Sequence, residues 1–202
     1  CGGDDSGDGF SFINVADSQG STESDYAHYN EVLSRAETTF EDAVFITHLG
    51  DMVDDGINED YWSWVLDTEE MQSLPVLPVA GNHEGRSEVG DLPIAIKAHY
   101  HLDIPEQDDS TGIYYSYQYE NATFIVLNTN DGDNAVSETQ LAWAEGVAQE
   151  ANADPDNDWL IVLTHKAPYS KGPHGDESDV LALRDTLNAF CAEYCVDLVL
   201  SG

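Results

Sequence analysis

The chain has 202 residues, of which 41% are hydrophobic, so it can bury a core and is not expected to be disordered over most of its length. It carries 40 acidic residues against 6 Lys and Arg, giving a formal net charge of -34. Such a surface excludes nucleic acid and anionic membranes as partners, because both are bound through clustered Lys and Arg. The carboxylates are spread along the chain, which favours a protein of a salt-adapted organism over a dedicated polyanionic binding surface: at 1 M salt the Debye length is about 3 Å.

The first ten residues, CGGDDSGDGF, are predicted to form a flexible acidic, Gly-rich segment (1–10) ahead of one folded domain (11–202). They contain no basic or apolar signal region, so an export signal would have been removed or would lie upstream. Cys1 and its Gly/Asp/Ser spacer resemble the start of a mature bacterial lipoprotein, in which the cysteine carries the lipid; a chance boundary at Cys1 is the other interpretation. We therefore expect an extracytoplasmic protein, secreted or lipid-anchored at the cell surface or in the periplasm.

Short apolar runs rich in β-branched residues predict strands, and longer patterns between them predict helices. The strands are expected at 10–16, 43–50, 74–81, 112–120, 122–129, 159–165 and 196–202, and the helices at 24–40, 58–74, 138–152 and 178–194. Strands that alternate with helices of this length indicate an α/β protein with a substantially parallel sheet. The runs at 112–120 and 122–129 are expected to pair as an antiparallel hairpin, so the sheets are predicted to be mixed.

Polar side chains stand at the carboxyl ends of four of these strands, which is the edge of an α/β sheet where ligands bind. They are Asp17, Asp51, Asn82, His83 and His165. Carboxylate oxygens and His nitrogens are ligands of first-row transition metals, and the two oxygens of Asp51 could bridge two ions. Gly50 and Gly81, directly before the polar groups, allow tight turns and close approach of the backbone. The pattern predicts a metal site at this edge.

The stretches ADSQ, GDMVDDG, GNHE and THKAP, in this order and each after a predicted strand, resemble the calcineurin-like metallophosphoesterase superfamily. This superfamily includes purple acid phosphatases and Ser/Thr protein phosphatases, and the resemblance runs from about Phe12 to Gly202. It implies a four-layer α/β/β/α sandwich with two mixed β-sheets. It also implies two metal ions, Mn, Fe or Zn, at one edge, and hydrolysis of phosphate esters in a small molecule or a phosphorylated substrate. Monoester and diester substrates both stay open.

The resemblance also implies the metal ligands. Asp17 would bind the first metal, Asp51 would bridge the two, and Asn82 and His165 would bind the second. Gln19 stands where many members have His. Because a neutral amide is a poorer ligand, the first metal is expected to be bound more weakly or through water.

Catalytic and substrate-binding roles follow in the same way. His83 would bind the phosphoryl group or protonate the leaving alkoxide. Asp54 stands where purple acid phosphatases carry a metal-binding Tyr, and matches the Asp that orients the catalytic His in Ser/Thr phosphatases. Asp55 replaces the substrate-binding Arg of those phosphatases, so their specificity is not supported. Arg86 is the nearest cationic candidate for a phosphate contact, and His174 is a second candidate for reaching substrate.

The family follows a strand such as VDLVLSG with Gly-His-x-His, whose histidines complete both metal sites, whereas this sequence stops at Gly202. If the sequence is a fragment, the chain as given is expected to bind metal poorly. Otherwise, the alternative is a non-catalytic acidic surface or binding domain that keeps the fold with an incomplete metal site. Taken singly, Asp51 and Asn82 could also cap helices or turns.

Two local patterns leave alternatives open. Cys191 and Cys195, four apart at the end of a predicted helix, could form a local disulfide or be two small buried residues. His99 and His101 in KAHYHLDIP share a strand-like alternation and could be a second metal-binding pair or a surface pair.

Overall fold

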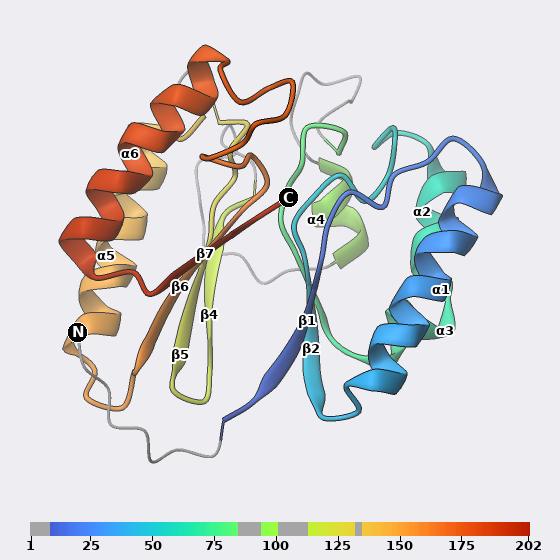
Figure 1. Ribbon diagram of the computed structural model, residues 1–202, viewed down its shortest axis with the longest axis horizontal. Coiled ribbons are helices and arrows are strands. Elements are labelled where there is room, and N and C mark those ends of the chain that lie inside the picture. The colour runs from blue at the N-terminus through green and yellow to red at the C-terminus, as the bar shows by residue number, and fades with distance from the viewer. Residues whose placement is uncertain (1–8, 85–93, 101–112, 132–134) are drawn as a thin grey trace. The chain divides into compact units, whose positions relative to one another are not determined.

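The computed structural model describes residues 9–84, 94–100, 113–131 and 135–202. The chain divides into two compact units. The N-terminal unit is Asp8–Leu102, and the C-terminal unit is Asp103–Gly202 together with Cys1–Gly7. Each unit has its own sheet and its own helices (Figure 1).

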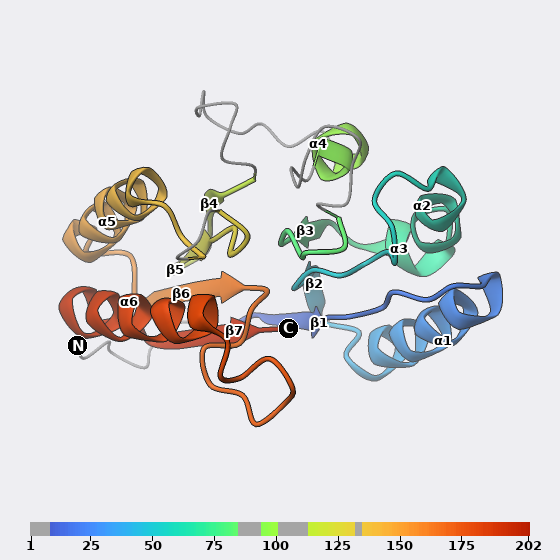
Figure 2. The same cartoon turned by 90° about the horizontal axis from the view of Figure 1, so that it is seen from above.

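In the N-terminal unit the described strands pair in the order β1-β2-β3, and both pairings are parallel. The strands are β1 (Ser11–Val15), β2 (Ala43–His48) and β3 (Val76–Pro78). The described helices are α1 (Glu23–Thr39), α2 (Glu59–Leu66), α3 (Glu69–Ser73) and α4 (Ile94–Tyr100). Helices α1, α2 and α3 lie on the same side of this sheet in both views (Figures 1 and 2). Because both strand pairings are parallel, the carboxyl ends of β1, β2 and β3 all lie at one edge of this sheet.

The single helix expected at 58–74 is wrong, because the chain breaks it into α2 and α3. Asn58 caps α2 by accepting from the backbone N–H of Asp60 (3.0 Å). At the break, Thr68 has an extended backbone and its hydroxyl accepts from the N–H of Met71 (3.3 Å), which starts α3. Thr68 is thus the N-cap of α3, and its side chain bonds an N–H group that has no partner within the helix.

The core of the N-terminal unit lies between the sheet and its helices. One buried apolar cluster of this core consists of Ile13, Leu33, Ala43, Ile46 and Met71. Leu33 on α1 is fully buried, whereas its neighbour Val32 is 63% exposed.

Replacing Leu33 with Ala is expected to lower the free energy of unfolding by about 2–5 kcal/mol, because it removes buried apolar contacts and leaves a cavity. The matched control is Val32→Ala, for which a change within about 0.5 kcal/mol is expected at an exposed position. Urea denaturation of both variants measures the difference. Equal effects at the two positions would show that α1 does not pack on the sheet through Leu33.

In the C-terminal unit the described strands pair in the order β4-β5-β6-β7. They are β4 (Tyr115–Tyr119), β5 (Ala122–Val126), β6 (Trp159–Thr164) and β7 (Leu198–Ser201). Helices α5 (Glu138–Ala153) and α6 (Ser178–Tyr194) lie on the same side of the sheet in both views (Figures 1 and 2). A buried apolar cluster joins them to the sheet and includes Ile125, Val162, Leu183 and Phe190.

The expected hairpin is confirmed. Tyr115 pairs with Val126 and Tyr119 with Ala122 in the antiparallel β4–β5 ladder, and β5, β6 and β7 are mutually parallel. The turn residue Glu120 has a left-handed backbone (φ 49°). Of the two mixed sheets expected, only this one mixes directions among the described strands. The described β1-β2-β3 sheet is parallel because helices carry the chain back between its strands. The α/β class is confirmed.

The two open local patterns have clear outcomes. Cys191 and Cys195 are both free thiols, so the local disulfide is not formed. Cys195 is also exposed and ends α6 with a left-handed backbone (φ 55°), so it is not a buried residue either. The strand-like interpretation of His99 is wrong, because His99 lies on α4, where its ring stacks on Trp62 (4.5 Å between centroids). His101 lies outside the described residues.

None of the helices in the described ranges is long and apolar enough to cross a membrane.

Candidate metal centre

Two acidic residues meet beyond the carboxyl ends of β1 and β2. The loops that carry them are joined by backbone bonds: Asp17 N–H donates to the carbonyl oxygen of Gly50 (3.1 Å), and Gln19 N–H donates to that of Asp51 (3.0 Å). One carboxylate oxygen of Asp17 lies within 4.8 Å of one of Asp51. Asp51 is only 4% exposed. The structure therefore brings together two of the predicted metal ligands in the N-terminal unit.

Both residues have an unusual backbone. Asp17 has φ 54° and Asp51 has φ 52°, in the left-handed region that residues other than Gly rarely occupy. Such conformations cost of order 1–3 kcal/mol each and cluster at functional sites. The turn expected at Gly50 is present, with φ 93°. The strained backbone at Asp17 and Asp51 thus lowers the stability of the fold at the two positions that carry the carboxylates.

The close approach expected at Gly81 is also found. A Cβ atom built on Gly81 would lie 2.3 Å from both the backbone nitrogen and Oδ1 of Asp51, which is too close for any side chain. Gly81 starts the turn that contains Asn82, His83 and Glu84 after β3. Glycine is therefore required there so that this turn can lie directly against the loop that carries Asp51.

Glu84 has a role that the sequence did not reveal. It is fully buried, and each of its oxygens accepts two backbone N–H groups. Oε2 accepts from Asp51 (2.9 Å) and Gly81 (2.8 Å), and Oε1 accepts from Met52 (2.6 Å) and Val53 (3.2 Å). Burial, and then the charge of Asp51, raise the pKa of Glu84, while these N–H donors lower it. Because all four contacts are donors, both oxygens must act as acceptors, which the ionised form provides.

His83 lies in the turn after β3 and contacts the loop after β2. Its backbone N–H donates to Oδ1 of Asp51 (2.9 Å), and its Nε2 is 3.9 Å from Oδ2 of the same residue. Its Nδ1 is 2.7 Å from the carbonyl oxygen of Asp54 and 3.3 Å from the Asp54 carboxylate. An acceptor at Nδ1 places the proton of the neutral ring on that nitrogen. Asp54 therefore contacts the His83 ring through both its carbonyl oxygen and its carboxylate.

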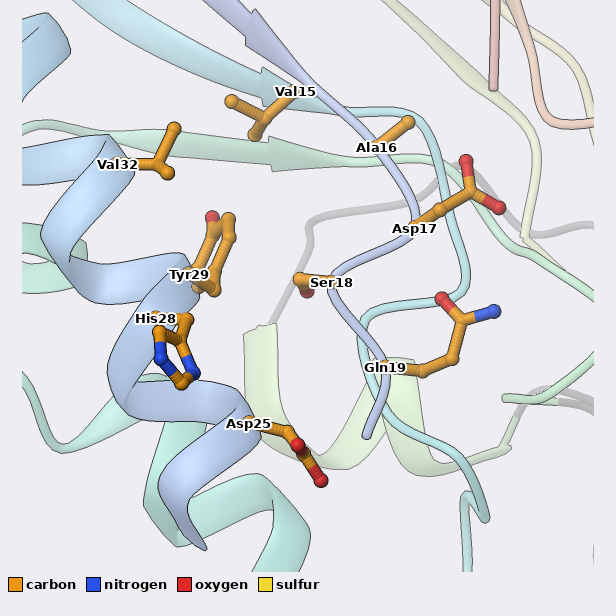
Figure 3. A pocket seen from close by; sticks show the side chains of 9 residues that line it. All are labelled: Val15, Ala16, Asp17, Ser18, Gln19, Asp25, His28, Tyr29 and Val32. Carbon is orange, nitrogen blue, oxygen red and sulfur yellow. The ribbon is translucent and has the colours of Figure 1, made fainter. Parts of the chain in front are cut away.

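Gln19 contributes an amide to the same edge. With its amide nitrogen turned toward the backbone, Gln19 donates to the carbonyl oxygens of Asp51 (2.7 Å) and Asp17 (3.3 Å). The Asp17 carboxylate points away from α1, whereas Ser18 points toward it (Figure 3). Between this loop and α1 is an open hollow of about 460 Å³. It is lined by Val15, Ala16, Asp17, Ser18, Gln19, Asp25, His28, Tyr29 and Val32.

His165 belongs to the C-terminal unit, directly after β6. It is 6% exposed, and its carbonyl oxygen accepts from the N–H of Gly202, which follows the neighbouring strand β7. The next residue, Lys166, donates its N–H to the hydroxyl of Thr129 (3.1 Å), in the segment after β5. These contacts hold together the chain segments that follow β5, β6 and β7, and His165 lies in the segment after β6.

The loop after His165 is held to α6 by cationic side chains. Arg184 donates to the carbonyl oxygens of Pro168 (2.6 Å) and Gly175 (3.1 Å). Lys166 contacts Asp179 (2.7 Å), and this hydrogen bond lowers the pKa of Asp179. His174 is exposed on this loop, with Nδ1 2.7 Å from Glu177. Arg86 lies outside the described residues.

A sequence profile of the calcineurin-like phosphoesterase family matches residues 10–202. The chain belongs to this family. Two uncharacterized proteins of Mycobacterium tuberculosis, from strains CDC 1551 / Oshkosh and ATCC 25618 / H37Rv, are 29% identical to this phosphoesterase-family chain over 149 residues. The match covers 67% of the chain and 28% of each relative, so the chain spans well under half of their length.

Solved structures similar to this phosphoesterase-family chain include two phosphatases. A dimetal phosphatase from Danio rerio has a TM-score of 0.65 at 16% identity, with 89% of this chain and 77% of that one covered. A purple acid phosphatase from yellow lupin seeds has a TM-score of 0.68 at 19% identity, with 95% and 37% covered. GAP50 of Plasmodium has a TM-score of 0.64 at 21% identity, with 95% and 64% covered. These likenesses confirm the metallophosphoesterase fold.

The phosphoesterase family uses divalent metals, and the side chains at the β1–β2 edge suit such ions. Two carboxylates held this close repel one another, and a cation between them removes that cost. Carboxylate oxygens with a nearby amide and imidazole match the ligands of first-row transition metals. Asn82, the predicted amide ligand, is exposed in the turn between Gly81 and His83. The donor set of the N-terminal unit thus fits a metal ion.

Proposed function

We propose that this chain hydrolyses phosphate esters with the help of two bound metal ions, Mn, Fe or Zn. The observation that carries the proposal is the meeting of the Asp17 and Asp51 carboxylates, both on left-handed backbone, at the carboxyl edge of a parallel sheet. Membership of the calcineurin-like phosphoesterase family supports the class of reaction.

In this proposal Asp17, with Gln19 beside it, would hold the first metal, Asp51 would serve both metals, and Asn82 and His165 would hold the second. When bound, the metals would supply the Lewis acidity that activates water and offsets the charge of the phosphoryl group. The chain's own contribution is to hold these ligands in place. The backbone bonds between the loops of Asp17 and Asp51 support that part of the proposal.

His83 is proposed to act on the substrate through Nε2. The Asp54 carbonyl oxygen lies at Nδ1, so Nε2 is the nitrogen proposed to face a phosphoryl oxygen or the departing alkoxide. Nε2 donates there when the ring carries a proton on both nitrogens. Asp54 keeps the ring in this orientation. Arg86 and His174 are proposed as further contacts to the phosphate ester.

The net charge of -34 opposes the approach of an anionic substrate, and salt weakens that repulsion. The charge supports the further proposal that the protein works in concentrated salt.

Removal of metal is the direct test. We expect chelation of the full-length protein to lower its hydrolysis of 4-nitrophenyl phosphate or of its bis(4-nitrophenyl) diester at least about 100-fold, because ligand-bound metals supply most of the activation of water. Adding back Mn, Fe or Zn should restore the activity, and Ca²⁺ serves as the control ion because it prefers a larger all-oxygen site.

Hydrolysis that persists in chelator would contradict a metal mechanism. A full-length protein that hydrolyses neither ester with any of these metals would instead favour the non-catalytic acidic binding domain.

A further inference from the structure

Glu84 connects the two loops that carry the proposed ligand Asp51 and the proposed catalytic His83. We propose that Glu84 is a positioning residue, whose carboxylate holds Asp51 and His83 in one fixed arrangement before any metal binds. This inference rests on the proposed function for its effect on metal and substrate, but the contacts themselves belong to the chain.

The first step is the set of four N–H groups around the carboxylate. Three successive amides of the loop after β2, those of Asp51, Met52 and Val53, converge on Glu84. The fourth comes from Gly81 in the turn of Glu84 itself. Because the carboxylate is fully buried, each of these amides depends on it in place of water. Glu84 thereby fixes the backbone on which the Asp51 carboxylate stands.

The second step is that the same turn carries His83. Its N–H donates to Asp51, its carbonyl oxygen accepts from the N–H of Gly56 (3.1 Å), and its ring contacts Asp54. A Cβ atom built on Gly56 would lie 2.5 Å from the carbonyl oxygen of Glu84. The turn of Glu84 and the loop after β2 are therefore in close contact beyond the hydrogen bonds of the Glu84 carboxylate.

The third step is that an amide cannot replace this carboxylate. Each oxygen of Glu84 faces two N–H donors, so Glu84→Gln must place an NH₂ group against one of these pairs. Two buried N–H groups then lose their acceptor, while the size of the side chain is unchanged. Glu84→Asp keeps the charge but is one methylene shorter, so it should retain part of the bonding.

The experiment compares the full-length wild-type protein with Glu84→Gln and Glu84→Asp. In metal-free protein, hydrogen exchange of the amides of residues 51–53 and 81 should be accelerated in Glu84→Gln and partly restored in Glu84→Asp. The affinity for Mn²⁺, measured by titration calorimetry, should fall about 10–100-fold in Glu84→Gln, the loss typical of a group that orients a ligand. For the ester substrate, kcat should fall more than KM changes.

Leu33→Ala is the matched control, because it destabilises the same unit from its core without touching these loops. It should leave the Mn²⁺ affinity and the relative exchange of residues 51–53 unchanged. If Glu84→Gln behaves like Leu33→Ala, or like wild type, the positioning role is wrong. If Glu84→Gln does not fold, Glu84→Asp decides by the same measurements.

A wild-type protein that neither binds Mn²⁺ nor hydrolyses the ester would overturn the proposed function instead. In that case the exchange of the four amides in metal-free protein still decides whether Glu84 fixes the two loops.

Discussion

Replacing Asp51 with Asn is expected to abolish both metal binding and phosphate-ester hydrolysis while leaving the fold intact. Asp51 is buried, and its Oδ1 accepts from His83 N–H, a bond that the amide oxygen of Asn can keep. The variant loses one oxygen and the negative charge, which are what a bridging ligand supplies. The loss of metal affinity should exceed the roughly 10–100-fold typical of an indirect partner.

The stability of the metal-free protein should not fall in Asp51→Asn. The Asp51 charge lies beside the buried Glu84 carboxylate and raises its pKa, so removing that charge relieves repulsion. Mn²⁺ titration, the rate of 4-nitrophenyl phosphate hydrolysis and thermal unfolding of the metal-free protein measure the three effects. Asp42→Asn is the matched control, since Asp42 is exposed and accepts a hydrogen bond from the Ser11 hydroxyl (3.1 Å) at the start of the sheet, away from the site. An Asp51→Asn protein that keeps metal and activity would show that Asp51 is not a ligand.

Replacing His83 with Gln is expected to lower kcat by about 10²–10⁴-fold, the usual contribution of a positioned acid or base, with the bound metal retained. The backbone bonds of His83 to Asp51 and Gly56 do not depend on its side chain. The Gln amide can still donate to the Asp54 carbonyl oxygen, but it cannot deliver a proton to a leaving group. The variant therefore tests the proton transfer by His83 separately from the binding of metal.

The leaving group decides which role His83 has. If His83 protonates the alkoxide, the loss in kcat should be far larger for an alkyl phosphate than for 4-nitrophenyl phosphate, whose leaving group needs little protonation. His28→Gln, at an exposed position on α1, is the control and should change neither. Equal losses for both substrates would restrict His83 to phosphoryl binding, and an unchanged kcat would remove it from the mechanism.

Much of the fold could be predicted because the strands are short, apolar and separated by long helical patterns. The run AVFITH became β2 and WLIVLT became β6, both largely buried, as expected for parallel strands covered by helices. The break between α2 and α3 was missed although Thr68 followed by Glu69 and Glu70 is a typical start of a helix. Helix α4 was missed because alternation of polar and apolar residues over a few positions does not separate strand from helix.

The candidate site was predictable to the extent that it depends on strand ends. Asp17, Asp51 and His83 follow adjacent parallel strands, so their proximity in the N-terminal unit follows from topology. The role of Glu84 was not predictable in this way, because sequence alone does not show which acid is buried or which backbone amides face it. The one available signal was an acid in the tight turn after Gly81, where a buried charge needs several donors.

The left-handed backbone at Asp17 and Asp51 has a consequence for how this domain would evolve in the laboratory. Selection for heat resistance alone rewards any change that relaxes a strained residue or separates like charges. Replacing Asp17 or Asp51 with glycine or asparagine relieves the backbone strain, the charge repulsion or both. Such a selection should therefore accumulate these replacements and lose the metal site. Retention of both acids through many generations therefore requires that the chemistry itself be under selection.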